Sequence, residues 1–165
     1  MGTLERTILE ITDNALDTSV EIIQRAFGTV ADEMGLTVEN CPVYPAFTTI
    51  EKLEEMRERG GIFFGLFVDG VQSGFVAIEK ERDNQYYLKR LAVLPEYRHG
   101  GFGRELVAFI IDHVKNRGIS KLCIAIVNEQ TVLKDWYKGM GFRETSVREF
   151  ERLPFTVCFM EMDIK

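Results

Sequence analysis

Residues 98–103 form a basic, glycine-rich segment whose spacing, Arg98-x-x-Gly101-x-Gly103, suits the binding of a phosphate group. An apolar stretch that ends in a proline precedes it, and the periodic pattern of an amphipathic helix begins at Phe102. Backbone N–H groups and the helix dipole both favour an anion at a helix N-terminus. Glycines let the backbone approach a ligand closely. We therefore predict that this segment holds a phosphate or a pyrophosphate.

Two well-defined phosphate-binding loops do not match this segment. A dinucleotide fingerprint requires a third glycine at the position of Leu106, and an acidic residue about twenty positions further on, where Lys121 to Cys123 lie. A nucleoside-triphosphate loop requires Gly-Lys before Ser or Thr, and the sequence has no such run. An ordinary helix entrance is the remaining alternative, but it explains one glycine and not three in four positions.

Length and composition set the class of protein. The chain has 165 residues, of which 45% are hydrophobic and 28% charged, and we expect a single globular domain over residues 1–165. Its net charge of −6 argues against a general nucleic-acid binder. No apolar run approaches the ~20 residues that span a bilayer, and the charged N-terminal segment does not look like a signal peptide. We expect a cytoplasmic protein without a nucleic-acid or membrane partner.

The three cysteines, Cys41, Cys123 and Cys158, are odd in number and widely spaced. This pattern predicts neither a disulfide framework nor a metal site. We expect reduced, buried thiols and no bound metal.

Apolar periodicity and turn residues predict seven strands and four helices. The strands are expected at residues 6–12, 62–68, 71–79, 85–93, 122–127, 142–150 and 155–164. The helices are expected between Asp13 or Asp17 and Gly28 or Gly35, from a Thr48/Glu51 capping box to Gly60, from Phe102 to Gly118, and over residues 129–140. The strand–helix–strand unit across the glycine loop predicts one parallel pair. The result is an α/β (α+β) fold with a mixed, mostly antiparallel seven-stranded sheet flanked by helices.

Two motifs resemble those of the GNAT superfamily of acetyl-CoA-dependent N-acetyltransferases. The run Leu-Ala-Val-Leu-Pro-Glu-Tyr-Arg that ends at Arg98, with the glycines after it, resembles the approach strand and the family's Arg/Gln-x-x-Gly-x-Gly/Ala. Residues 136–142, Trp-Tyr-Lys-Gly-Met-Gly-Phe, resemble the family's Leu-Tyr-Glu-Lys-x-Gly-Phe ending. One predicted helix and one predicted strand separate the two motifs, as the family requires, and the order of elements is similar along nearly the whole chain.

The resemblance implies how acetyl-CoA, as cosubstrate, binds. The backbone of Leu91, Ala92 and Val93 is expected to pair with the pantetheine arm, which requires the central parallel strands to splay apart. The residues expected around the pyrophosphate are Arg98, His99, Gly100, Gly101, Phe102, Gly103 and Arg104.

Two of the residues assigned to the pyrophosphate have simpler alternatives. Arg98 can form charge-assisted contacts with phosphate oxygens, or it can pack against Glu96 or remain solvated. His99 can contact phosphate, or it is an exposed loop histidine.

The resemblance also implies the catalytic groups. Tyr137 is expected to face the CoA sulfur as general acid, because a phenol can protonate or stabilise a leaving thiolate. The alternative is a buried aromatic beside Trp136. Some relatives have a carboxylate base early on the fourth strand, where this chain has Tyr86 and Tyr87. Glu79 on the preceding strand is the substitute candidate, and its alternative is a solvated charge.

Asn128 and Gln130 lie where the family often places an amide near the pantetheine. Asn128 could instead cap the next helix. Gln130 stands where relatives often have asparagine, which is a departure from the family pattern.

The expected function is acetyl transfer from acetyl-CoA to a primary amine by direct attack in a ternary complex. The acceptor is expected to be a small molecule or a peptide, and the protein a monomer or a homodimer. Alternatives are another acyl-CoA as donor, or a sensor that binds CoA thioesters without turnover. The sequence does not name the amine.

Overall fold

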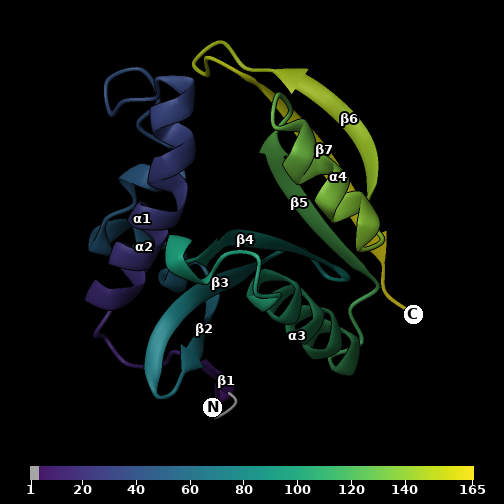
Figure 1. The fold of residues 1–165 in the computed structure, drawn as a ribbon. Helices are drawn as coiled ribbons and strands as arrows, with labels where there is room; N and C mark the ends of the chain where they lie inside the picture. Colours follow the sequence, from purple (N-terminus) through teal and green to yellow (C-terminus); the bar gives the residue numbers. More distant parts are fainter. Residues whose placement is uncertain (1–3) are drawn as a thin grey trace.

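The computed structural model describes residues 4–165 (Figure 1). The strands form one sheet with helices on both faces. The elements are β1 (Arg6–Glu10), α1 (Asp17–Met34), η1 (Pro45–Phe47), α2 (Ile50–Glu58), β2 (Ile62–Val68), β3 (Val71–Arg82), β4 (Gln85–Val93), η2 (Pro95–Tyr97), α3 (Phe102–Asn116), β5 (Lys121–Val127), α4 (Thr131–Gly139), β6 (Arg143–Glu149) and β7 (Thr156–Asp163). The predicted elements are therefore confirmed, with ends that differ by a few residues.

The strand order is β1-β2-β3-β4-β5-β7-β6. Every neighbouring pair is antiparallel except β4 and β5, which are parallel. The mixed, mostly antiparallel sheet is therefore as predicted. The single parallel pair follows from the crossover through α3, which returns the chain to the same end of the sheet.

The two central strands pair over only part of their length. Their register covers three positions and ends where Tyr87 lies opposite Cys123. Beyond that point β4 continues to Val93, and β5 continues to Val127 while it pairs with β7 on its other side. Figure 1 shows the two strands diverging there, with β4 toward α1 and α2 and β5 toward α4. The expected splay is confirmed, and it leaves one backbone edge of each strand without a strand partner.

Alternate residues of β2 and β3 fill two separate cores, as the period of two in a strand requires. Phe64 and Val76 point into a core with α3, whereas Phe63 and Phe75 point into a core with α1 and α2. Both faces of this half of the sheet are thus covered, which fits the nearly continuous apolar runs of the two strands.

A third, smaller apolar cluster joins segments that are distant in the sequence. Tyr44, in the connection between α1 and α2, packs edge-on against Phe27 and Phe155, with ring centroids 5.8 and 6.3 Å away. Val127 at the end of β5 belongs to the same cluster. The connection after α1 therefore contacts the β6–β7 turn, and the two meet beyond the diverging ends of β4 and β5 (Figure 1).

The capping box predicted for α2 is wrong by one residue. Thr49 is the N-cap, and its side chain accepts a hydrogen bond from the Lys52 N–H. Thr48 is buried instead, and its hydroxyl donates to the Pro45 carbonyl at 2.7 Å. No helix between Leu4 and Lys165 is both long and apolar enough to cross a membrane.

Candidate active site

The glycine loop turns sharply into the first turn of α3. His99 and Gly101 both have positive φ, at 65° and 82°. Gly101 is the N-cap of α3, and no side chain caps the helix there. The first N–H groups of a 15-residue helix are therefore available to an anion, as the sequence predicts.

One further loop position is crowded by an aromatic ring. A Cβ on Gly100 would lie 2.9 Å from the ring of Phe102, which is too close for any larger residue without a shift. Phe102 itself is buried, with its ring edge-on to Tyr97 and under the guanidinium of Arg6. Phe102 thus anchors the loop to the core.

The three basic residues of the loop differ in their surroundings. Arg98 donates to the Ala26 carbonyl at 2.7 Å and to the Thr29 hydroxyl at 3.1 Å, so its side chain ties the loop to α1. Its alternative partner Glu96 accepts from Arg25 instead, at 2.9 Å. His99 and Arg104 are exposed.

The end of β4 lies beside this loop. Ala92 is buried against α1 and α2, whereas Leu91 and Val93 pack toward the core with α3. All three lie beyond the last paired position of β4 and β5, on the edge that the splay exposes. An extended ligand can pair with such an edge as an additional strand.

Helix α4 reaches the same place from the other half of the sheet. The indole of Trp136 lies 3.5 Å from the position of a Cβ on Gly103, and Val93 lies 4.0 Å from that position. Tyr137 is buried and packs edge-on against Trp136 and Phe142, with centroids 4.9 and 5.5 Å away. Burial raises the pKa of the Tyr137 phenol far above its ordinary value. The phenol therefore remains protonated at neutral pH.

The two predicted amide residues lie between β5 and α4. The side-chain oxygen of Asn128 accepts a hydrogen bond from Lys134, and its backbone N–H donates to Thr156 at 2.9 Å. Gln130 occupies the N-cap of α4 without a capping side-chain bond. Asn128 therefore does not cap this helix.

Glu79 lies on the face of β3 that α1 and α2 cover. Its side chain is 13% exposed, and its two oxygens contact Arg59 at 3.2 Å and Lys89 at 3.3 Å. The carboxylate is therefore neither solvated nor unpaired. It lies opposite Tyr87 in the β3–β4 register.

Arg90 and Leu91 lie in a bulge of β4. The register between β3 and β4 shifts here, and Arg90 has a positive φ of 52°. Its Nε donates to the Thr48 hydroxyl at 3.2 Å. Burial lowers the pKa of Arg90, while Glu79 raises it in part. No local sequence pattern indicates this residue, because arginine has no preference for left-handed backbone.

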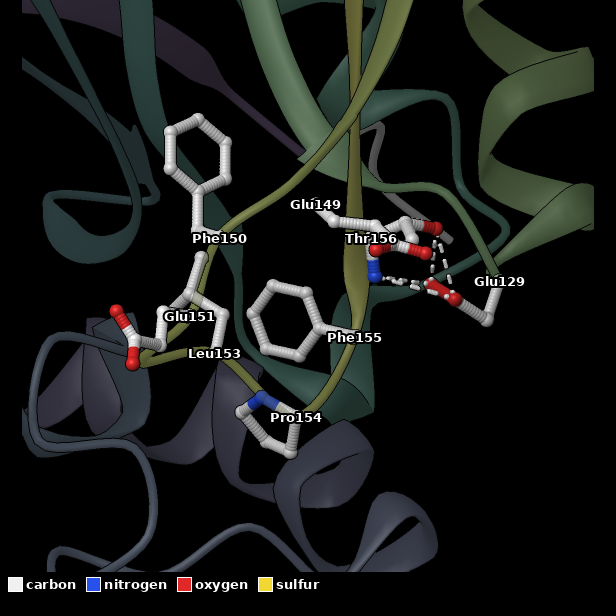
Figure 2. Close-up of a pocket in the computed structure, with 8 residues that line it drawn as sticks. All are labelled: Glu129, Glu149, Phe150, Glu151, Leu153, Pro154, Phe155 and Thr156. Carbon is white, nitrogen blue, oxygen red and sulfur yellow. Dashed lines mark hydrogen bonds between the residues drawn. The ribbon is translucent and has the colours of Figure 1, made fainter.

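An open cavity of about 590 Å³ lies at the β6–β7 turn (Figure 2). Glu129 accepts hydrogen bonds there from the N–H and hydroxyl of Thr156, which fixes the turn after β5 to the start of β7. Burial alone would raise the pKa of Glu129, but these hydrogen bonds lower it below its ordinary value. The lining residues are Glu129, Glu149, Phe150, Glu151, Leu153, Pro154, Phe155 and Thr156.

The N-terminus of α3 suits an anion, and the open edge of β4 suits an extended chain. Trp136 links the two to Tyr137, because its indole lies near Gly103 and Val93 and packs against the Tyr137 ring. Among residues 4–165, no group of three or more His, Cys, Asp or Glu side chains is arranged to hold a metal ion.

Comparison with known sequences agrees with this geometry. Residues 26–142, well over half of the chain, match the Acetyltransferase (GNAT) family. The chain belongs to the GNAT family. The matched region runs from α1 to the end of the second GNAT motif, and it contains the glycine loop, the splayed strands and Tyr137.

Several GNAT relatives are similar over part of their length. A probable N-acetyltransferase camello from Xenopus tropicalis is 28% identical over 123 residues, which cover 70% of this chain and 56% of the relative. The [ribosomal protein bS18]-alanine N-acetyltransferase of Escherichia coli K12 is 28% identical over 85 residues, 52% of this chain and 57% of the relative. This GNAT chain thus spans just over half the length of these curated relatives.

A solved N-acetyltransferase structure has the same fold. The PaiA N-acetyltransferase from Thermoplasma acidophilum, in complex with coenzyme A, superposes with a TM-score of 0.80. The match covers 96% of this chain and 99% of that one at 21% identity, so it supports the fold alone.

Proposed function

We propose that this protein transfers an acetyl group from acetyl-CoA to a primary amine by direct attack in a ternary complex. The observation that carries the proposal is the convergence of three parts at the splay. These are the N-terminus of α3 at Gly101, the open edge of β4 at Leu91 to Val93, and Tyr137 on α4. The family membership and the coenzyme A complex of a similar fold support the same proposal.

The proposed binding mode assigns one part of the cosubstrate to each element. The pyrophosphate accepts hydrogen bonds from N–H groups of residues 99–104, with the exposed Arg104 adding a charge-assisted contact. The pantetheine arm pairs with residues 91–93 and places the thioester between β4 and β5. Asn128 and Gln130 lie at the far end of the same gap and supply amide contacts to the arm.

The reaction then follows from the two reacting groups. The acceptor ammonium first loses a proton, and the neutral nitrogen attacks the thioester carbonyl carbon. A C–N bond forms and the C–S bond breaks, the nitrogen releases a second proton, and the sulfur leaves as a thiolate that takes up one proton. An alkyl ammonium has a pKa near ~10.4, so the neutral form costs ~4.6 kcal/mol at pH 7. The site must therefore remove a proton as well as position the nitrogen.

We assign the acid role to Tyr137. A phenol is protonated at neutral pH even at its ordinary pKa of ~10, and burial raises the pKa of Tyr137 further. The protonated phenol donates a hydrogen bond to the developing thiolate. The thioester sulfur of bound acetyl-CoA carries no charge, so this hydrogen bond stabilises the transition state and the departing thiolate more than the bound substrate.

We assign the base role to Glu79, acting directly or through water. Its carboxylate is held in place by Arg59 and Lys89, and each of its oxygens retains a further lone pair for a proton or a water molecule. Replacement by glutamine keeps the shape of the side chain and removes the basic oxygen, so Glu79→Gln should lower kcat with little change in acetyl-CoA affinity.

Calorimetric titration with CoA, followed by thiol release with a panel of amines, tests the proposal. We expect CoA binding and thiol release that depends on both acetyl-CoA and an amine. The absence of CoA binding would overturn the proposal, and binding without release would favour a sensor. Propionyl-CoA or succinyl-CoA turned over faster than acetyl-CoA would change the donor and leave the binding mode in place.

A further inference from the structure

Among residues 4–165, Arg90 has one neutral hydrogen-bond partner for its side chain. Its Nε donates to the hydroxyl of Thr48 at 3.2 Å, and that hydroxyl in turn donates to the Pro45 carbonyl at 2.7 Å. This chain of hydrogen bonds fixes the connection between α1 and α2 above the bulge in β4. The bond from Arg90 to Thr48 uses one of the five N–H groups of the guanidinium.

The terminal nitrogens of Arg90 have no hydrogen-bond partner among the described residues. Within the part of the chain that the structure describes, Nε2 of His113 is the one side-chain nitrogen or oxygen that is both fully buried and without a hydrogen-bond partner. The terminal nitrogens of Arg90 lack a partner but are not in this class, so they are not fully buried. The residue as a whole is half-buried. A half-buried guanidinium with unused N–H groups can donate hydrogen bonds to a ligand.

The nearby carboxylate of Glu79 does not neutralise Arg90. Glu79 contacts Arg59 at 3.2 Å and Lys89 at 3.3 Å, and so already has two cations. Three cations therefore face this carboxylate on one side of β3 and β4. The local excess of positive charge favours an anionic ligand.

The position of Arg90 relates this charge to the reaction. Arg90 immediately precedes Leu91, the first residue proposed to pair with the pantetheine arm, and it points to the side covered by α1 and α2, where it contacts Thr48. The pyrophosphate is proposed to lie at the N-terminus of α3, and Leu91 and Val93 pack toward the core with that helix. An acceptor that reaches the thioester from the opposite side would pass the guanidinium.

We propose that the open edge of the Arg90 guanidinium binds a carboxylate of the acceptor, and that the acceptor is an α-amino acid. The inference rests on the proposed function. A guanidinium binds a carboxylate through two parallel hydrogen bonds, which fixes both position and orientation. In an α-amino acid the amine lies two bonds from the carboxyl carbon, so this contact would hold the nucleophile beside the bulge, next to the thioester.

Matched substrates test the proposal. The twenty standard L-α-amino acids and the corresponding L-α-amino amides are compared by kcat/KM, with unmodified protein, Arg90→Gln and Arg90→Lys. We expect the best acid to exceed its amide by about tenfold or more, as is typical of a hydrogen bond to a charged group. Arg90→Gln should abolish the preference by raising KM for the acid. Arg90→Lys should restore part of it, because it keeps the charge and loses the two-point geometry.

The control variant is Arg59→Gln. This variant removes a cation from the same face of β3 and β4, but one that already contacts Glu79. The ratio of kcat/KM between the amino acid and its amide should therefore remain. Calorimetric CoA affinity of each variant shows whether it is folded. Thr48→Val provides a second measurement if Arg90→Gln does not fold, because it keeps the guanidinium and should keep the preference.

Three results would overturn the proposal while the proposed function stands. They are equal turnover of acids and amides, activity with amines that lack a carboxylate but with no amino acid, and an equal loss of preference in Arg59→Gln and Arg90→Gln. The absence of CoA binding by unmodified protein would overturn the proposed function, and this inference with it.

Discussion

The indole of Trp136 lies against the first turn of α3, 3.5 Å from the position that a Cβ on Gly103 would take. This contact joins two helices that stand on different halves of the splayed sheet (Figure 1). Any ligand that runs from the glycine loop into the gap between β4 and β5 must pass this ring. Trp136 is the one tryptophan of the chain, and its fluorescence therefore reports on this point alone.

We predict that CoA changes the emission of Trp136. The midpoint of the fluorescence titration should agree with the Kd measured by calorimetry, since both report occupation of the same gap. Unchanged emission at saturating CoA, with binding still visible by calorimetry, would place the ligand away from Trp136.

Gly101 and Gly118 offer a matched pair at the two ends of α3. Both have positive φ, at 82° and 75°, and at neither position would an added Cβ meet another atom within 4 Å. Replacement by alanine should destabilise the protein by about 1–2 kcal/mol in each case, from backbone strain alone. Only Gly101→Ala should also weaken CoA binding, because only that end is proposed to meet the pyrophosphate. Equal CoA affinity in the two variants, measured by calorimetry, would contradict the assignment.

Arg98 is predicted to couple the loop to α1. Arg98→Ala removes hydrogen bonds to Ala26 and Thr29, and it should lower both thermal stability and CoA affinity. Thr29→Val removes one of these partners and keeps the charge, so its effect on affinity should be smaller. If Arg98 contacts phosphate directly, the salt dependence of CoA binding should also weaken in Arg98→Ala. Unchanged affinity in that variant would remove Arg98 from the site.

Tyr137→Phe should lower kcat roughly 100-fold, the scale of a general acid. The KM for acetyl-CoA should change little, because the phenol is proposed to act on the leaving sulfur and not on binding. Tyr86→Phe, which removes a phenol from a partly buried position on β4, is the control and should keep its turnover. Full activity of Tyr137→Phe in a thiol-release assay would end the proposed acid role.

Stability should fall in mild acid because of His113. Its Nε2 is buried without a hydrogen-bond partner, and its ring lies against Phe64 and Phe109. Burial lowers the pKa of His113, Arg117 lowers it further, and Glu10 partly opposes this. Because the folded-state pKa lies below the ordinary value of 6.5, the unfolded chain binds the proton first.

The contribution of neutral His113 to the free energy of unfolding is therefore fully present above pH ~6.5. It is lost as the pH falls through and below that value, and the free energy of unfolding then falls by at most ~1.36 kcal/mol per pH unit. Urea unfolding between pH 7 and pH 5 measures it. His113→Phe should flatten this part of the profile, whereas His99→Asn, at the exposed loop histidine, should not. An identical slope in His113→Phe and unmodified protein would exclude His113 as the cause.

Much of the fold could be predicted because its signals are local. The short apolar run at residues 122–127 predicts β5 from neighbouring residues alone. The end of α1 was limited to Gly28 or Gly35, and Gly35 is its C-cap. The splay was expected only through the resemblance to the GNAT superfamily, since no local pattern marks the point where two strands stop pairing. The structure confirms it beyond Tyr87 and Cys123.

Long-range contacts could not be predicted in the same way. The bond from Arg98 to the Ala26 carbonyl joins residues 72 positions apart and depends on how α1 packs. The left-handed conformation of Arg90 depends on a register shift against β3. The N-cap of α2 was assigned to Thr48 in place of Thr49 for the same reason. Thr48 is buried through its contacts with Arg90 and α1, which the adjacent sequence does not indicate.

A crystal structure of the protein soaked with coenzyme A would test the proposed binding mode without an intermediate assumption. We expect the diphosphate at the N-terminus of α3, within hydrogen-bond distance of the N–H groups around Gly101 and Gly103, and the pantetheine arm along residues 91–93. A diphosphate bound at any other place, with this helix end left to solvent, would contradict the binding mode and the function built on it.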